Sequence, residues 1–215
     1  MMTKIFSSAV IGLEAVPVEV EVDIAAQGLP SFTIVGLPDK AVEEAKERVR
    51  AAIRNSGADF PARKITINLA PADLPKEGPS YDLPIALGIL IASGQLQADV
   101  SKLLFSGELS LDGRVRSING ALIQAIMAKQ QKLKQFFLPV ENAREAAIID
   151  DVDIFAVTSL QALFHHLSNV QPLEKILPIN FDSVEYEHVY DYDMEDIRGQ
   201  QQAKRALEIA AAGSH

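Results

Sequence analysis

The chain has 215 residues, enough for one domain or two small ones, and its 48% hydrophobic content suffices for a packed core. The absence of Cys excludes disulfides, Fe–S clusters, cysteine zinc sites and thiol catalysis, and the lack of any signal-like or membrane-length apolar run predicts a soluble, cytoplasmic protein without membrane contact. The net charge of −9 argues, as an average, against a protein that coats nucleic acid.

The first part of the chain is expected to form strands and one amphipathic helix. Apolar residues alternate with polar ones from Val16 to Ile24, a period of two that indicates a half-buried strand. Further strands are expected at 5–12, 31–36 and 64–70. Between them, apolar residues at helical spacing predict a helix from about Val42 to Ile53 that ends at Gly57.

The second part is expected to alternate helices with strands after a loop over 70–80. Residues 81–94 are almost wholly apolar and predict a buried helix with Pro84 in its first turn. Asp112-Gly113 predicts the turn of a hairpin over 103–118. The later elements expected are helices at 121–132, from Glu141 and at 159–167, and strands at 135–140 and 152–157.

These elements predict an α/β fold of the α+β two-layer kind over residues 1–168, with a mixed sheet and helices packed on it. Residues 169–195 are interpreted as an acidic, Pro-containing linker, because seven acidic residues and no Lys or Arg lie between 182 and 196. A dedicated cation-binding or partner site in this stretch stays open as the less favoured alternative. A final helix is expected over 196–213.

A basic segment runs from Lys40 to Lys64, with seven basic and four acidic residues. Lys46, Arg48, Arg50 and Arg54 are therefore candidates for contacting nucleic acid. The favoured alternative is an ordinary helix surface, on which these residues pair with Glu three or four positions away.

Ser80 follows Gly78-Pro79 at the expected start of the buried helix. A serine presented there lies beside free backbone N–H groups and the positive end of the helix dipole, which can stabilise an oxyanion or bind phosphate. Serine is also a good helix N-cap, so the position needs no function.

The segments EGPS (77–80), SGELSLDGRVRSINGALIQAIMAK (106–129) and FFLPVENARE (136–145) resemble, in order and spacing, the proteolytic domain of Lon proteases. In that family the Ser of the GPS motif is the nucleophile and a Lys two residues after a glycine pair is its base. Ser80 matches the nucleophile, but the lysine position falls on Leu122. Leucine cannot accept a proton, and Lys129 and Lys132 lie two to three helical turns further on. We therefore expect no catalytic residue, with Ser80 a helix cap or ligand contact.

The strings VGLPDKAVEE (35–44) and NLAPADLPKEG (68–78) resemble the N-terminal domain of magnesium-chelatase-like AAA+ ATPases, the YifB or ComM family, along essentially the whole chain. The resemblance implies a domain of the ribosomal protein S5 domain 2 type, also described as Lon-like, followed by a AAA+ motor. ComM-type members are assigned as hexameric, ATP-driven helicases that promote branch migration of DNA during natural transformation. DNA, ATP and Mg²⁺ are thus expected with the full-length protein.

The same resemblance places part of an adenine pocket at Ile197 and Gly199. The phosphate loop G-x-x-x-x-G-K-[ST] does not occur in this sequence, so residues 196–215 are interpreted as the truncated start of the motor, and no bound cofactor and no ATP hydrolysis are expected. His165, His166 and His188 lack paired ligand spacing, and no metal site is expected. Two alternatives remain: a Lon-type peptidase using Ser80, and a non-catalytic module that binds nucleic acid or protein.

Overall fold

The computed structural model describes residues 2–179, 193–194 and 196–213. They belong to two compact units, Met1–Phe181 and Asp182–His215. Most of the expected acidic linker, and His188 with it, lies outside the described residues. The described residues include no helix that is long and apolar enough to cross a membrane.

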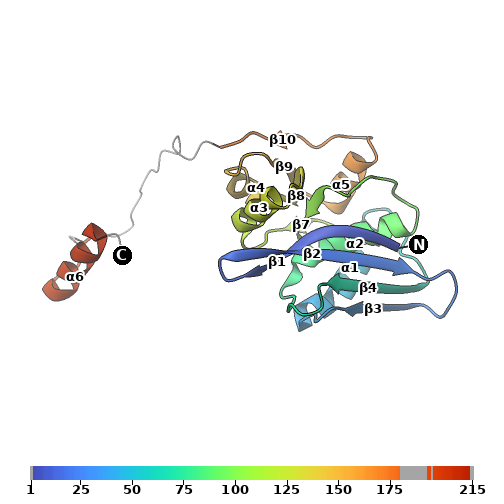
Figure 1. Cartoon of the computed structure of the whole chain (residues 1–215), viewed down its shortest axis with the longest axis horizontal. Helices are drawn as coiled ribbons and strands as arrows, with labels where there is room; N and C mark the ends of the chain where they lie inside the picture. Colours follow the sequence, from blue (N-terminus) through green and yellow to red (C-terminus); the bar gives the residue numbers. More distant parts are fainter. Residues whose placement is uncertain (1, 180–192, 195, 214–215) are drawn as a thin grey trace. The chain divides into compact units, whose positions relative to one another are not determined.

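Four strands form one half of the first unit's eight-stranded sheet (Figure 1). They are β1 (Met2–Ile11), β2 (Glu14–Ile24), β3 (Ser31–Val35) and β4 (Lys64–Ala70). β2 pairs antiparallel with both β1 and β4, and β3 runs parallel to β4 at the edge. In β2, Val18, Val20 and Val22 are buried while the Glu residues between them are not, which confirms the predicted alternation.

The other half of the sheet is mainly parallel. It contains β5 (Leu103–Phe105), β8 (Gln135–Pro139), β9 (Asp153–Val157) and β10 (Lys175–Ile176). The complete strand order is β10-β9-β8-β5-β1-β2-β4-β3. β10 pairs antiparallel with β9, so the first unit includes residues beyond 168 that the sequence suggested were linker.

Helices cover the two halves of the sheet differently. α1 (Lys40–Asn55), α2 (Asp82–Ala92) and α5 (Leu160–Leu167) share one apolar core with β2 and β4, whereas α3 (Ala121–Gln130) and α4 (Val140–Ala146) share a second core. In β8, Phe136 belongs to the second core and Phe137 to the first, so the strand is buried on both faces. The mixed α/β sheet is thus two-layered at β2–β4 and covered on both sides around β8.

α2 is the most buried helix of the first unit, with every residue from Asp82 to Ala92 buried. Pro84 lies in its first turn, as predicted. Gly88 lets the helix approach the sheet closely, because a methyl group built at this residue would overlap Val22 Cγ2 of β2. Gly88 therefore allows α2 to pack directly on β2.

The hairpin predicted over 103–118 is only partly correct. Its arms are the short strands β6 (Glu108–Leu109) and β7 (Val115–Arg116), joined through Gly113 with a φ of 86°. Residues 103–105 instead form β5, between β1 and β8. Leu104 and Phe105 are both buried, one in each core, which suits a parallel strand covered on both faces rather than a hairpin arm.

In the second unit, α6 runs from Gln201 to Ala212 and buries none of its residues. The helix begins later than the predicted residue 196, because Gly199 and Gln200 adopt left-handed backbone conformations with φ of 73° and 52°.

Candidate functional site

Ser80 lies in a short 3₁₀ turn, Pro79–Tyr81, directly before α2. Gly78 precedes the turn with a φ of 78°, and its N–H donates to Oδ2 of Asp39 at 3.1 Å. On the other side, the Ser80 carbonyl oxygen accepts from the Gly107 N–H at 2.9 Å. These two contacts fix the turn between the start of α1 and the strand segment that leads to β6.

Ser80 does not cap a helix. Gly78 holds the N-cap position of the 3₁₀ turn and Tyr81 that of α2, and neither position has a side-chain capping hydrogen bond. The capping explanation offered by the sequence is therefore wrong. Ser80 instead lines a cleft of about 710 Å³.

The cleft has three walls. One is the end of β1 with the turn after it, from Ala9 to Gly12, where β1 lies beyond its single paired position with β5 at Phe6. The second is the loop that carries Ser80, together with Asp39. The third consists of Glu108, Ser117, Ile118, Asn119 and Gln124. The cleft therefore lies where the β1–β2 hairpin, α1, the Ser80 loop and the start of α3 meet.

Gln124, rather than Leu122, is the α3 side chain that reaches this cleft. Leu122 does not line it, and its N–H donates to Oε1 of Glu145 at 3.0 Å. Gln124 is buried; its Nε2 donates to the Asn119 carbonyl at 3.2 Å, and its Oε1 has no hydrogen-bond partner. A buried, unpartnered amide oxygen can accept a hydrogen bond from a ligand, but it cannot act as a base for Ser80.

Cationic and imidazole groups are missing from the cleft. None of the described residues that line it is Lys, Arg or His. The nearby Lys76 is buried, and its Nζ donates to the carbonyl oxygens of Pro71 and Leu74, the latter at 2.7 Å. Burial lowers the pKa of Lys76. Lys129 is paired with Asp151 at 3.2 Å and does not line the cleft.

The carboxylates of the cleft are Asp39, Glu77 and Glu108. Both carboxylate oxygens of Asp39 accept backbone hydrogen bonds. Oδ1 accepts from the Val42 N–H at 2.7 Å, as the N-cap of α1, and Oδ2 accepts from the Gly78 N–H. Glu108 lies 3.6 Å from Arg116. The lining therefore offers hydrogen-bond acceptors to a neutral or cationic group, and among the described residues that form it there is no Lys or His that could act as a base for Ser80.

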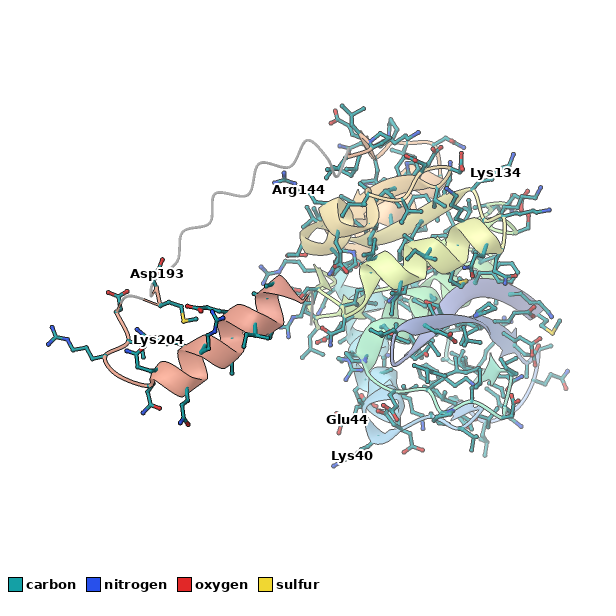
Figure 2. The ribbon with its side chains drawn as sticks, turned by 60° about the vertical axis from the view of Figure 1, so that its left-hand side comes forward. Lys40, Glu44, Lys134, Arg144, Asp193 and Lys204 are labelled. Carbon is teal, nitrogen blue, oxygen red and sulfur yellow. The ribbon has the colours of Figure 1, made fainter. Side chains whose placement is uncertain are left out.

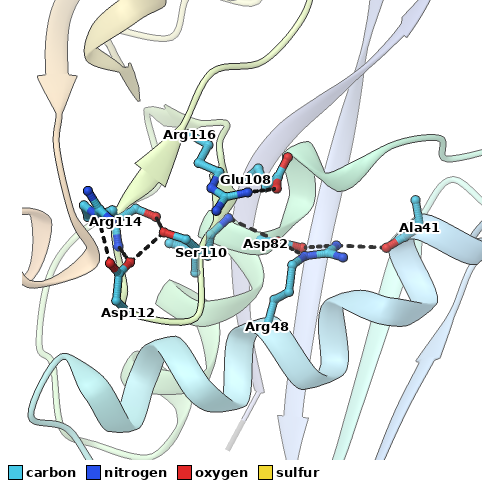
Figure 3. A network of polar contacts seen from close by, with 9 residues as sticks. Ala41, Arg48, Asp82, Glu108, Ser110, Asp112, Arg114 and Arg116 are labelled. Atoms are coloured by element: carbon cyan, nitrogen blue, oxygen red, sulfur yellow. Dashed lines mark hydrogen bonds and ion pairs between the residues drawn. The ribbon is translucent and has the colours of Figure 1, made fainter.

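Arg48, a nucleic-acid candidate, serves a structural role (Figure 3). Its Nε donates to Oδ2 of Asp82 at 2.6 Å and its Nη2 to Oδ1 at 3.0 Å, and Nη2 also donates to the Ala41 carbonyl at 2.9 Å. The Asp82 carboxylate is fully buried and also accepts from the Leu109 N–H at 3.1 Å. Burial raises the pKa of Asp82 to about 6, although the bonds from Arg48 and Leu109 oppose the rise. The pair links α1 to the first residue of α2.

The remaining nucleic-acid candidates occupy different surroundings. Lys46 is half-buried on α1. Arg50 pairs with Glu47 at 3.0 Å, and Arg54 is exposed in the last turn of α1. The structure brings these two arginines together with Arg63, a residue that was not a sequence candidate, in a second cavity.

The proposed adenine-contacting residues lie in the second unit. Ile197 is 45% exposed there, and Gly199 comes just before α6. Among the described residues, no group of three or more His, Asp or Glu side chains is placed to hold a metal ion.

Comparison with known proteins identifies relatives along the whole chain. The family described as subunit ChlI of Mg-chelatase matches residues 20–142, and the family described as magnesium chelatase, subunit ChlI, matches residues 193–215. The competence protein ComM of Haemophilus influenzae is 43% identical over 98% of this chain and 42% of its own length. The uncharacterized protein YifB of Escherichia coli is 44% identical over 100% of this chain and 41% of its own length.

A more distant similarity joins the chain to Lon protease 2 of Bacillus subtilis, with 29% identity over 77% of this chain and 33% of the relative. The chain spans about two fifths of the length of ComM and YifB. The match over residues 20–142, together with the similarity to ComM and YifB along nearly its whole length, shows that this chain belongs to the Mg-chelatase ChlI family.

Proposed function

We propose that the chain is part of a ComM-like, Mg-chelatase-type AAA+ ATPase that acts on DNA as a helicase and promotes branch migration in natural transformation. The observation that carries the proposal is the 43% identity to a competence protein over 98% of the chain. Because the chain covers only 42% of that relative, ATP-driven work is assigned to the longer protein, which we propose assembles as a hexamer.

ATP and Mg²⁺ would bind mainly outside this chain. Its sequence has no G-x-x-x-x-G-K-[ST] phosphate loop, whose backbone N–H groups and Lys hold the phosphates. Ile197 and Gly199 could supply at most an apolar contact and a close backbone approach to adenine. They do not by themselves make an ATP site, and no chemical step is assigned to residues of this chain.

For the first unit we propose an accessory, non-catalytic role. The support is the composition of the Ser80 cleft, whose described lining includes no Lys or His and in which both carboxylate oxygens of Asp39 already accept backbone hydrogen bonds, from Val42 and Gly78. The unit keeps a Lon-like cleft whose chemistry is suited to binding rather than to hydrolysis.

The DNA role is tested with the longer protein. Its ATPase rate should rise when single-stranded or branched DNA is added, and it should move the branch of a synthetic four-way junction in the presence of ATP. A non-hydrolysable ATP analogue should abolish branch movement and serves as the control. An ATPase rate indifferent to every DNA structure, with no junction processing, would remove the DNA role.

The non-catalytic role is tested separately with the 215-residue chain. A fluorophosphonate probe, which reacts with activated serines, should not label it above the level of the heat-denatured chain. Ser80→Ala should change nothing, and Ser117→Ala, which removes another hydroxyl from the same cleft, is the matched control. Labelling that Ser80→Ala abolishes and Ser117→Ala retains would establish the peptidase alternative instead.

A further inference from the structure

A second cavity, of about 270 Å³, lies at the end of α1 and carries positive charge. We call it the arginine pocket and define it by Arg50, Arg54, Arg63, Phe32, Phe60 and Pro61. Three guanidinium groups and no carboxylate line it. The fold brings these residues together from the last two turns of α1, the edge strand β3 and the segment that leads into β4.

The three arginines differ in how they are held. Arg50 is fixed, because it pairs with Glu47 at 3.0 Å and its Cζ lies 5.3 Å from the centre of the Phe60 ring. Arg54 and Arg63 are exposed, and neither has an ion-pair partner among the described residues. Two free guanidinium groups therefore stand beside a third that is anchored on an aromatic ring.

Ordinary structural roles explain only part of this arrangement. Arg54 in the last turn complements the negative end of the α1 dipole. That explanation does not extend to Arg63, which lies outside any helix and adds like charge to the same cavity. Arg54 and Arg63 have no acidic partner among the described residues, so their like charges repel each other, and a bound anion relieves the repulsion.

Two aromatic rings line the same pocket as the three arginines. The rings of Phe32 and Phe60 are half-buried and 5.7 Å apart between centroids, with a tilt of 40°. Guanidinium groups beside aromatic rings are the combination by which proteins hold single-stranded nucleic acid, with phosphates on the cations and bases on the rings. An acidic peptide would use the charges but would not need the rings.

We propose that the arginine pocket binds one nucleotide unit of a single-stranded nucleic acid, with its phosphate on Arg54 and Arg63 and its base against Phe32 and Phe60. Its volume lies below the range of roughly 300–1,000 Å³ typical of pockets that enclose a whole small ligand, which suits one unit of a longer strand. The inference deepens the proposed role on DNA and rests on it for the choice of nucleic acid over other polyanions.

The test measures binding of a fluorescein-labelled oligo(dT) to the 215-residue chain by fluorescence anisotropy over a range of salt concentrations. In the double variant Arg54→Glu/Arg63→Glu, affinity at low salt should fall at least tenfold. The magnitude of the slope of log affinity against log salt should fall by about 0.7, because loss of the one phosphate contact that Arg54 and Arg63 share removes about 0.7 for a single strand. Circular dichroism checks that each variant is folded.

The matched control is Lys134→Glu/Arg144→Glu, which changes the net charge equally. Both residues are exposed, and Figure 2 shows them away from the beginning of α1 at Lys40 and Glu44. Lys134 directly precedes β8, and β5, β1, β2 and β4 lie between β8 and the edge strand β3, which carries Phe32 of the arginine pocket. This control should lose less than threefold in affinity. Equal losses in the two double variants would show unspecific attraction and overturn the proposal, as would parental affinity in Arg54→Glu/Arg63→Glu.

Phe32→Leu tests the contribution of the base, since it keeps an apolar side chain and all charges. It should weaken oligo(dT) binding about fivefold or more while leaving the salt slope unchanged. Polyglutamate and inorganic phosphate serve as competitors. If Phe32→Leu has no effect and polyglutamate competes as well as unlabelled oligo(dT), the pocket is a general anion site and the proposal is overturned.

Failure of the arginine-pocket proposal and failure of the proposed DNA role give different results. DNA-stimulated ATPase activity in the longer protein that is unchanged by Arg54→Glu/Arg63→Glu, together with unchanged oligo(dT) binding, rejects the arginine pocket alone. Pocket-dependent binding of oligo(dT) by the 215-residue chain, with no DNA effect on the longer protein's ATPase, rejects the helicase role and keeps the pocket.

Discussion

Replacing Arg48 with Met should destabilise the first unit strongly, and more at pH 8 than at pH 5. The substitution removes two of the three hydrogen bonds to the Asp82 carboxylate, at 2.6 and 3.0 Å, and leaves only the Leu109 N–H on a carboxylate with no solvent exposure. Removing one partner of a buried ion pair costs about 3–5 kcal/mol. For a unit of this size, that corresponds to a fall of roughly 6–20 °C in Tm.

The pH dependence follows from the remaining carboxylate. Burial already raises the pKa of Asp82 to about 6 with Arg48 present, and Arg48 is the main group that opposes the rise. In Arg48→Met, protonation of Asp82 removes the unpaired buried charge, and the carboxyl group is protonated to a larger extent at pH 5 than at pH 8. The destabilisation should therefore be smaller at pH 5.

The measurement is urea unfolding, followed by far-ultraviolet circular dichroism at both pH values. The exposed Arg144→Met is the control for loss of a surface charge. Arg48→Met/Asp82→Asn should be more stable at pH 8 than Arg48→Met, because the unpaired charge is gone while Leu109 keeps its acceptor. A cost below 1 kcal/mol at pH 8, or equal costs at the two pH values, would refute the reasoning.

Three further predictions concern the parent chain and two close contacts. Because the pKa of Asp82 is about 6 in the folded chain and near 3.9 in an unfolded one, the folded chain holds an extra proton between about pH 4 and 6. This group therefore makes the free energy of unfolding fall as pH rises through that window, and Asp82→Asn should remove its contribution from a pH series of urea unfolding. Gly88→Ala should destabilise by about 1–2 kcal/mol in urea unfolding, since overlap with Val22 outweighs the gain of about 1 kcal/mol in helix propensity, and adding Val22→Ala should relieve the overlap. Asp39→Ala should cost about 1 kcal/mol through loss of the cap on the Val42 N–H, and Asp39→Asn, which can still cap, should recover most of the stability in thermal unfolding.

Local patterns were sufficient to predict most of the fold. The alternation in β2 and the apolar face of α1 are visible in the sequence because each element buries one side only. β5 was misassigned because a short strand buried on both faces has no alternation, and the Asp-Gly turn after it suggested one continuous hairpin. β10 was missed because two residues are too few to show any period.

Only part of the Ser80 cleft could be predicted from the sequence. The GPS turn identifies Ser80 directly, whereas the resemblance to proteases draws attention to Leu122. Residues 122 and 124 differ by about 200° around a helix, so they face different surroundings. The available signal for Gln124 was its position as the lone amide in the apolar run from Ala121 to Ala128.

The basic segment shows why a charge cluster in a sequence does not define a binding surface. Arg48 and Arg50 are two residues apart on α1, yet one is bound to the buried Asp82 and the other lies over Phe60. Arg63 reaches the arginine pocket from the segment before β4, through a contact that only the packing of β3, β4 and α1 creates. The spacing of arginines in the sequence does not show which of them pairs with a buried carboxylate.

The Ser80 cleft and the arginine pocket lie near opposite ends of α1 and are lined by side chains of opposite charge. Asp39 caps its beginning and lines the Ser80 cleft, while Arg54 lies in its last turn and lines the arginine pocket. Fifteen residues of helix separate these positions, about 22 Å along the axis. The cleft is lined by carboxylates and no cation, so it repels a polyanion that the arginine pocket attracts. If the arginine pocket binds a nucleic-acid strand as proposed, that strand is kept away from Ser80, and the cleft remains free for a neutral or cationic ligand.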